Sequence, residues 1–293
     1  MTGTRPLLWR WDGHRMIGML YACPDGLHSD SDSLAALLLP GGAQTRMGAG
    51  RALVALARLM AAHGIPTLTC DWAGQGDSEG TPVPFAERIS QIAAARTALT
   101  TATGAHRHLV IGICDGASAA LLAAGEEGCP GDIRPADRPA GLVLVNCWMR
   151  DDDLAPPRGW LTAALVRRLS GGREYGEGGS ARLRPPSWRG FWAGLRSAHR
   201  LSRKAQGALE RRLHAAATAC PAPILWVMSR YDPTGRDALI RLRHPRWRRL
   251  MREGKHRRLV LAGDDHGLLD PRNRLALVTK IRTLFQITTS KAA

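Results

Sequence analysis

The feature that most constrains this chain is an apolar run that turns abruptly into an alanine-rich segment. Residues 109–113 form the apolar run, and residues 117–124 have the composition of a helix. Between them stands Gly112-Ile-Cys114-Asp-Gly116, where two glycines allow neighbouring backbone to pass close by. The pattern predicts a strand, a sharp turn and a helix, with Cys114 at the helix N-terminus. There the positive end of the helix dipole favours a nucleophilic thiolate.

The rest of the chain alternates between apolar runs and segments with helical periodicity. We expect a hairpin over 7–22, with Asp12-Gly13 as its turn. The expected strands are 34–39, 65–70, 109–113, 141–146, 223–228 and 258–262, and the expected helices are 46–63, 85–99, 117–124, 237–251 and 272–285. Apolar runs without alternation suit strands that are buried on both faces. The chain is therefore predicted to be an α/β protein with a mainly parallel, doubly wound sheet.

Residues 150–215 break this alternation with Pro-Pro, Gly-Gly, arginines and several tryptophans. We therefore expect the first part of the core over 1–149, a helical lid or insertion over 150–215, and the second part of the core over 216–293. An insertion above the carboxyl ends of the strands would supply aromatic walls to a ligand pocket. The alternative is a peripheral helical unit that contacts no ligand.

Composition excludes several classes of protein. The six cysteines are scattered without ligand-like spacing, which predicts neither a disulfide framework nor a metal site. No apolar run approaches the roughly 20 residues that span a bilayer, and the first residues lack the features of a signal peptide. We expect a cytoplasmic protein with no transmembrane segment and no cofactor.

The formal charge of +16 comes mostly from arginine. Such a surface attracts anions, including phosphate groups, anionic lipid and acidic carrier proteins. The alternative is a solvated arginine-rich surface with no specific partner. No helix-turn-helix, zinc-finger or RNA-binding signature accompanies the charge, so nucleic acid is not expected as a partner.

The segment around Cys114 resembles the nucleophile elbow of α/β-hydrolases, with cysteine in place of serine. In that fold an acid and then a histidine follow the nucleophile, each on a loop after a strand. Asp232 follows the strand expected over 223–228, and His266 follows the strand expected over 258–262. Chain order and strand position therefore agree on a Cys114, Asp232 and His266 triad.

Each member of this triad has an alternative role. Asp232 precedes proline and could simply form a turn. His266 could be a loop histidine held by Asp264 or Asp265. Asp237 is a reserve candidate for the acid, although it is expected inside the next helix.

Acyl transfer also needs hydrogen-bond donors aimed at the developing oxyanion. The backbone N–H of Asp115 directly follows the nucleophile and is the first candidate. The second comes from Gly41-Gly42-Ala43-Gln44 after the early buried strand, where we favour the N–H of Ala43 over that of Gly42. The alternative is a glycine-rich turn without a catalytic role.

Several segments together resemble a narrower group, the type 1 hydrolases associated with exosortase A systems. These segments are residues 40–46, 71–80, 112–118, 146–148 and 245–250. The resemblance implies that Cys114, Asp232 and His266 are nucleophile, acid and base. The chain departs from the group at Ala73, where arginine is usual, at Gln91, where aspartate is common, and at Gly267-Leu-Leu after the histidine.

The predicted function is acyl transfer through a thioester on Cys114. Hydrolysis of an ester or thioester is the first hypothesis, with a small-molecule acyl substrate such as a coenzyme A or acyl carrier protein thioester. The second is an acyltransferase that passes the acyl group to an amine or alcohol. Dienelactone hydrolases and polyhydroxyalkanoate synthases look similar at this position, and they represent hydrolysis and acyl transfer, respectively. The third hypothesis is a non-catalytic, carrier-binding module, which the complete triad opposes.

Overall fold

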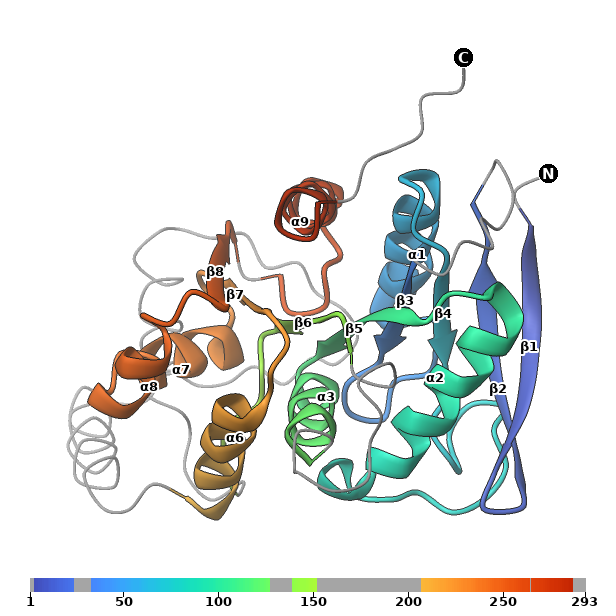
Figure 1. The fold of residues 1–293 in the computed structure, drawn as a ribbon, viewed down its shortest axis with the longest axis horizontal. Helices are drawn as coiled ribbons and strands as arrows, with labels where there is room; N and C mark the ends of the chain where they lie inside the picture. The colour runs from blue at the N-terminus through green and yellow to red at the C-terminus, as the bar shows by residue number, and fades with distance from the viewer. Residues whose placement is uncertain (1–2, 24–32, 127–138, 152–206, 264, 287–293) are drawn as a thin grey trace, which may run out of the picture.

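One continuous sheet organises the chain. The computed structural model describes residues 3–23, 33–126, 139–151, 207–263 and 265–286. Within these residues the sheet has eight strands in the order β1-β2-β4-β3-β5-β6-β7-β8 (Figure 1). The strands are β1 (Thr4–Trp11), β2 (His14–Tyr21), β3 (Leu34–Leu39), β4 (Thr67–Cys70), β5 (Arg107–Ile113), β6 (Gly141–Val145), β7 (Ile224–Ser229) and β8 (His256–Leu261). The helices are α1 (Ala52–Ala62), α2 (Ile89–Thr103), α3 (Asp115–Glu126), α6 (Ala208–Ala219), α7 (Pro233–Arg241), α8 (Pro245–Leu250) and α9 (Pro271–Leu284), with short 3-10 helices η1 (Ala49–Arg51) and η2 (Phe85–Glu87).

Most strands of the sheet run parallel. β1 and β2 form the expected hairpin, which pairs Trp11 with His14 at its turn, and β2 runs antiparallel to β4. Every pair from β4 across to β8 is parallel. The central strands β5, β6 and β7 are almost entirely buried, which explains their unbroken apolar sequences. The expected mainly parallel, doubly wound sheet is therefore confirmed.

Helices cover the sheet on both faces. α1 and α9 lie on one face, whereas α2, α3 and α6 lie on the other (Figure 1). Leu56 of α1 belongs to the same buried cluster as Ile111 of β5, and Leu121 of α3 belongs to the opposite cluster with Val110. Successive side chains of a strand point to opposite faces, so β5 is packed from both sides. It carries Cys114 to the carboxyl edge of a rigid sheet.

Three of the expected helices were wrong in their bounds. The helix expected over 85–99 is divided into η2 and α2, and α2 continues to Thr103. The helix expected over 46–63 begins only at η1 and α1, because Arg51 adopts a left-handed φ of 62° and residues 46–48 form a loop. The helix expected over 237–251 is divided into α7 and α8. Pro245 ends any continuous helix because it has no N–H to donate, and it occupies the first turn of α8.

The expected insertion falls largely outside the described residues, which resume at 207. α6 crosses the boundary expected at 215 and packs against α3, where a Cβ on Gly125 would lie 2.4 Å from the Ala216 Cα atom. The described helices include none that is both long and apolar enough to cross a membrane.

Candidate active site

The turn between β5 and α3 places Cys114 in a strained backbone conformation. Its φ is 56°, a value that L-residues adopt rarely. Both glycines of the motif are required by packing. A Cβ on Gly112 would lie 2.3 Å from the Gly116 carbonyl oxygen, and a Cβ on Gly116 would lie 2.6 Å from the Pro40 carbonyl oxygen. The small residues therefore let the turn close beneath Cys114, as the sequence predicts.

Cys114 also differs from the other described cysteines in its exposure. It is partly exposed, whereas Cys23, Cys70, Cys147 and Cys220 are buried. Burial raises the pKa of the Cys70 and Cys147 thiols to about 12, which keeps them protonated. Among the described cysteines, only Cys114 thus combines access with a helix N-terminus.

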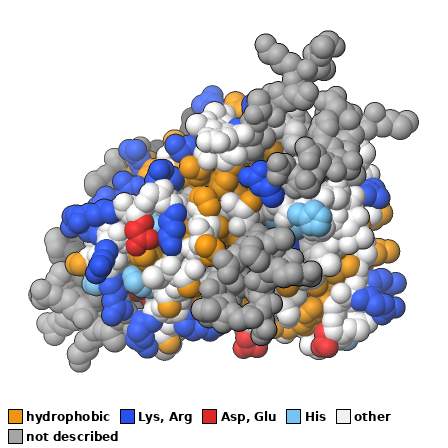
Figure 2. Space-filling view, in the orientation of Figure 1, with side chains coloured by type: hydrophobic (Ala, Val, Ile, Leu, Met, Phe, Trp, Pro, Cys, Tyr) orange, Lys and Arg blue, Asp and Glu red, His pale blue; other side chains and the backbone are white. Residues whose placement is uncertain are grey.

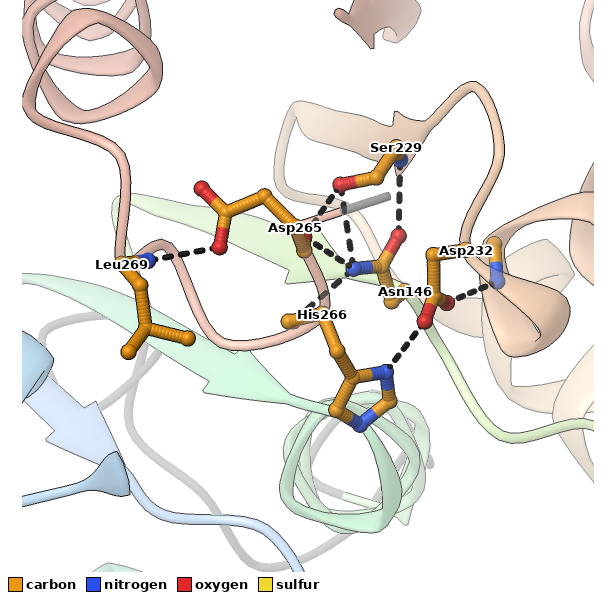
Figure 3. A network of polar contacts seen from close by, with 7 residues as sticks. Asn146, Ser229, Asp232, Asp265, His266 and Leu269 are labelled. Carbon is orange, nitrogen blue, oxygen red and sulfur yellow. Dashed lines mark hydrogen bonds and ion pairs between the residues drawn. The ribbon is translucent and has the colours of Figure 1, made fainter. Parts of the chain in front are cut away.

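Asp232 and His266 meet at the carboxyl edge of the sheet, although 34 residues separate them (Figure 3). The Nδ1 atom of His266 lies 2.9 Å from Oδ1 of Asp232. Asp232 is also the N-cap of α7, where its Oδ2 accepts the Gly235 N–H at 2.6 Å. Because it is only 3% exposed, Asp232 is a fixed, desolvated acceptor beside the imidazole.

The imidazole of His266 lies between Asp232 and Cys114. Burial lowers its pKa, but hydrogen bonds to Asp232 and to the Cys114 sulfur, together with their charges, raise that pKa to about 10. A protonated imidazole beside a thiolate is the ion pair that activates a cysteine nucleophile. The structure therefore brings together the three side chains expected to form a triad.

The alternative partners are engaged elsewhere. The carboxylate of Asp265 accepts the backbone N–H groups of Leu269 at 2.6 Å and Asp270 at 3.0 Å, so it holds the loop and not the ring of His266 (Figure 3). Asp237 binds the Nε of Arg241 at 2.8 Å. Asp264 lies outside the described residues.

The loop after β3 packs directly against the nucleophile. A Cβ on Gly41 would lie 2.5 Å from the Ile113 carbonyl oxygen and 2.9 Å from the Cys114 Cβ atom. The Gly42 N–H donates to Oδ1 of Asp115 at 2.5 Å, so this donor is occupied. Neither the N–H of Ala43 nor that of Asp115 donates to an acceptor within the described part of the chain. Both remain available to an oxygen atom of a ligand.

A buried ion pair beneath this loop was missed in the sequence. Asp71 is fully buried and accepts the Arg46 backbone N–H at 2.6 Å while also pairing with the Arg46 guanidinium. The same guanidinium lies 2.6 Å from Oδ2 of Asp77. Burial lowers the pKa of Arg46, but Asp77 and Asp71 raise it overall. Arg46 therefore links the loop after β3 to the loop after β4.

Two positions that depart from the exosortase-associated pattern contact each other. The Ala73 N–H donates to Oε1 of Gln91 at 3.0 Å in a buried contact. In the described ranges, no cluster of three or more His, Cys, Asp or Glu could hold a metal ion.

Comparisons with known proteins agree with this architecture. A family model described as the alpha/beta hydrolase family matches residues 36–278. No curated protein sequence matches the chain significantly.

Many solved structures share the fold at low sequence identity. The Pyrococcus furiosus esterase Pf2001 is 13% identical, with a TM-score of 0.59 over 97% of this chain and 91% of that one. Est1E from Butyrivibrio proteoclasticus, solved with ferulic acid bound, is 14% identical, with a TM-score of 0.58 over 96% and 98%. The thioesterase domain from the curacin biosynthetic pathway is 13% identical, with a TM-score of 0.52 over 97% and 99%. At these identities the likeness establishes the fold alone.

Proposed function

Because the chain belongs to the alpha/beta hydrolase family, we propose that it hydrolyses an ester or thioester through an acyl-enzyme on Cys114. The observation that carries this proposal is the contact of His266 with both Asp232, at 2.9 Å, and the Cys114 sulfur. A base oriented by a buried acid and in contact with a nucleophile is the arrangement that covalent acyl transfer requires.

The chemistry proceeds in two steps. The Cys114 thiolate attacks the carbonyl carbon of the substrate, and a C–S bond forms as the carbonyl oxygen becomes an oxyanion. When the intermediate collapses, the bond to the leaving alcohol or thiol breaks and the His266 imidazolium supplies the proton. A water molecule then attacks the thioester, with His266 as base, and releases the acid.

The N–H groups of Ala43 and Asp115 would hold the oxyanion. Support comes from the Gly42 N–H, which is occupied by Asp115, whereas the N–H of the adjacent Ala43 has no acceptor among the described residues. Asp115 begins α3, so its N–H is one of the helix N-terminal donors without an intrahelical acceptor. Donors fixed in advance at the developing charge are worth several kcal/mol of barrier, about 3–4 for each.

A cysteine nucleophile also favours transfer as a second candidate function. The acyl-enzyme of a cysteine is a thioester, which reacts readily with amines relative to water. The same triad could therefore pass the acyl group to an amine or alcohol acceptor. This outcome differs from hydrolysis only in the second step.

An anionic acyl donor suits the surface of the protein. Arginine and lysine side chains gather over α7, α8 and β8 (Figure 2), where Arg243, Arg248 and Arg249 are exposed. A basic surface steers anions toward the protein, and coenzyme A and acidic carrier proteins both present thioesters on anionic molecules. The names of the esterase and thioesterase neighbours indicate carbonyl substrates of the same class.

Product analysis tests the proposal and separates its two forms. Purified protein is incubated with a panel of acyl-coenzyme A thioesters and p-nitrophenyl esters, with and without an added amine or alcohol, and thiol or phenol release is followed. Release with water alone supports hydrolysis. Release that depends on the acceptor, with the acylated acceptor as product, supports transfer. A folded protein that releases neither thiol nor phenol from any donor contradicts both.

A further inference from the structure

Asn146 lies at the centre of the acid–base side of the site and has no role in the chemistry described so far. It follows the last residue of β6, is fully buried, and adopts a left-handed φ of 47°. Its neighbours hold the nucleophile turn: the Cys114 N–H donates to the Val145 oxygen at 2.9 Å, and the Trp148 N–H donates to the Cys114 oxygen at 3.1 Å. Asn146 is therefore rigidly placed relative to Cys114.

The side-chain amide of Asn146 joins the end of β7 to the loop after β8 (Figure 3). Its Nδ2 donates to the backbone oxygen of His266 at 2.9 Å and to that of Asp265 at 3.3 Å. Its Oδ1 accepts the Ser229 N–H at 2.8 Å. Ser229 in turn donates its hydroxyl to the Asp265 oxygen at 2.5 Å. One amide thus links the ends of β6 and β7 to the loop that carries the base.

The same amide also contacts the turn that carries the acid. A Cβ on Gly235 would lie 2.5 Å from Oδ1 of Asn146, so the first turn of α7 rests on this side chain. Gly235 is the residue whose N–H holds the Asp232 carboxylate. Asn146 therefore lies beneath both partners of the Asp232–His266 hydrogen bond.

Asparagine satisfies both the hydrogen-bonding and the backbone demands of this position. The side chain must accept one hydrogen bond from an N–H and donate to two carbonyl oxygens, which requires both halves of an amide. Aspartate offers only acceptors when ionised and would face the His266 and Asp265 carbonyls with a negative charge. Asparagine also tolerates the left-handed conformation better than other residues with a side chain.

We propose that Asn146 is a positioning residue that fixes the base loop at the distance where the His266 ring contacts the Cys114 sulfur. The inference rests on the proposed function, because it assigns Asn146 to the same catalytic pair. A merely structural asparagine would stabilise the fold without affecting how the folded protein pairs its thiolate and imidazolium. The two roles therefore predict different results from a readout on Cys114 itself.

The experiment measures the rate at which iodoacetamide alkylates Cys114 from pH 5 to 9, by mass spectrometry of the peptide that contains it. In the wild type, we expect the His266 imidazolium beside Cys114 to keep alkylation measurable at pH 6. In Asn146→Gly, which permits the left-handed φ, and in Asn146→Asp, we expect the rate at pH 6 to fall by about tenfold, since small misplacements within a site have effects of this order or more. The pH dependence should shift toward that of a free thiol, and kcat should fall more than KM changes.

Matched variants keep the inference falsifiable. Thr103→Ala removes a buried hydroxyl that bonds the Leu99 oxygen at 2.7 Å at the far end of the sheet, so it should lower the unfolding temperature and leave the Cys114 profile unchanged. If either Asn146 variant fails to fold, Ser229→Ala removes only the hydroxyl bonds of the network and should give a smaller shift, about threefold, in the same direction.

The outcomes separate this inference from the function on which it rests. The positioning role is overturned if folded Asn146 variants unfold at a lower temperature but keep the wild-type pH dependence of Cys114 alkylation. If Ser229→Ala has to be used instead, an unchanged pH dependence in that variant overturns it as well. A wild type with a reactive Cys114 at pH 6 but no turnover of any donor contradicts the proposed function instead.

Discussion

The nucleophile side of the site is held by backbone packing, whereas the acid–base side is held by buried side-chain hydrogen bonds. On the nucleophile side, Gly41, Gly112 and Gly116 leave no room for a Cβ, and Cys114 takes a left-handed φ. On the acid–base side, the amide of Asn146 and the carboxylate of Asp232 join loops that are far apart in sequence.

This difference determines how substitutions on each side of the site should affect the protein. Backbone packing fixes the nucleophile locally, because the strand, turn and helix are contiguous in the chain. The base depends on long-range bonds, and removing one buried partner leaves the other unsatisfied at a cost of about 1–3 kcal/mol. We therefore expect substitutions on the two sides to fail in different ways: through the fold on the nucleophile side and through catalysis on the acid–base side.

The largest effect should come from Asp232→Asn. This change keeps the shape of the side chain but removes the charge that orients and stabilises the His266 imidazolium, so kcat/KM should fall by about 10³-fold or more. The control is Asp237→Asn, since Asp237 is also buried on α7 but binds Arg241. Steady-state kinetics on the best donor from the panel would distinguish them, and equal losses in both variants would refute the assignment of Asp232 as the acid.

A glycine on the nucleophile side should affect folding more than chemistry. Gly112→Ala introduces a Cβ at 2.3 Å from backbone oxygen, which should destabilise the fold by about 3 kcal/mol. Gly64→Ala is the matched control, because its Cβ would meet nothing within 4 Å and only its φ of 81° opposes it. That variant should cost about 1 kcal/mol. Urea unfolding measures both, and similar costs would contradict the close packing of the turn.

The ion pair beneath the loop after β3 should matter less, and unequally for its two carboxylates. Arg46→Ala leaves the fully buried Asp71 without its countercharge and should cost about 2 kcal/mol, less than a completely buried pair because Arg46 is 21% exposed. Asp77→Ala removes the exposed partner and should cost under about 1 kcal/mol. Equal losses of unfolding free energy would show that burial does not distinguish the two pairs.

The last effect is a pH dependence of stability on the acid–base side, which solvent screening reduces because the His266 side chain is 37% exposed. The folded pKa of His266, about 10, lies above its ordinary value of 6.5. Its contribution to stability is thus fully present below pH 6.5 and is lost as the pH rises toward 10. The difference in unfolding free energy between the wild type and His266→Gln should shrink over this interval. A difference that grows with pH would contradict the raised pKa.

The sequence predicted most of the architecture and the members of the candidate triad. Local patterns were sufficient where one segment determines its own conformation, as in the apolar strands, the Asp12-Gly13 hairpin and the glycine turn around Cys114. Element bounds failed at Arg51 and Pro245, where a single backbone conformation overrides helical periodicity.

The residues that hold the site in place were harder to predict from the sequence. Asn146 and Arg46 belong to segments that the family resemblance marks, but their partners lie 25 to 120 residues away, and no local pattern specifies such contacts. The signal that could have found Asn146 is a polar residue placed directly after a wholly apolar strand. Buried amides are kept there only when their hydrogen bonds are satisfied.

The central claim, that Cys114 carries the acyl group, is tested most directly by locating that group during turnover. The wild type is mixed with the best acyl donor, quenched in acid within the first turnover, and digested for mass spectrometry, with Cys114→Ala treated in parallel. We predict up to one acyl group per chain, on the peptide that contains Cys114, and neither adduct nor turnover in Cys114→Ala. Turnover by the wild type without acyl label on Cys114, or undiminished turnover by Cys114→Ala, would contradict it.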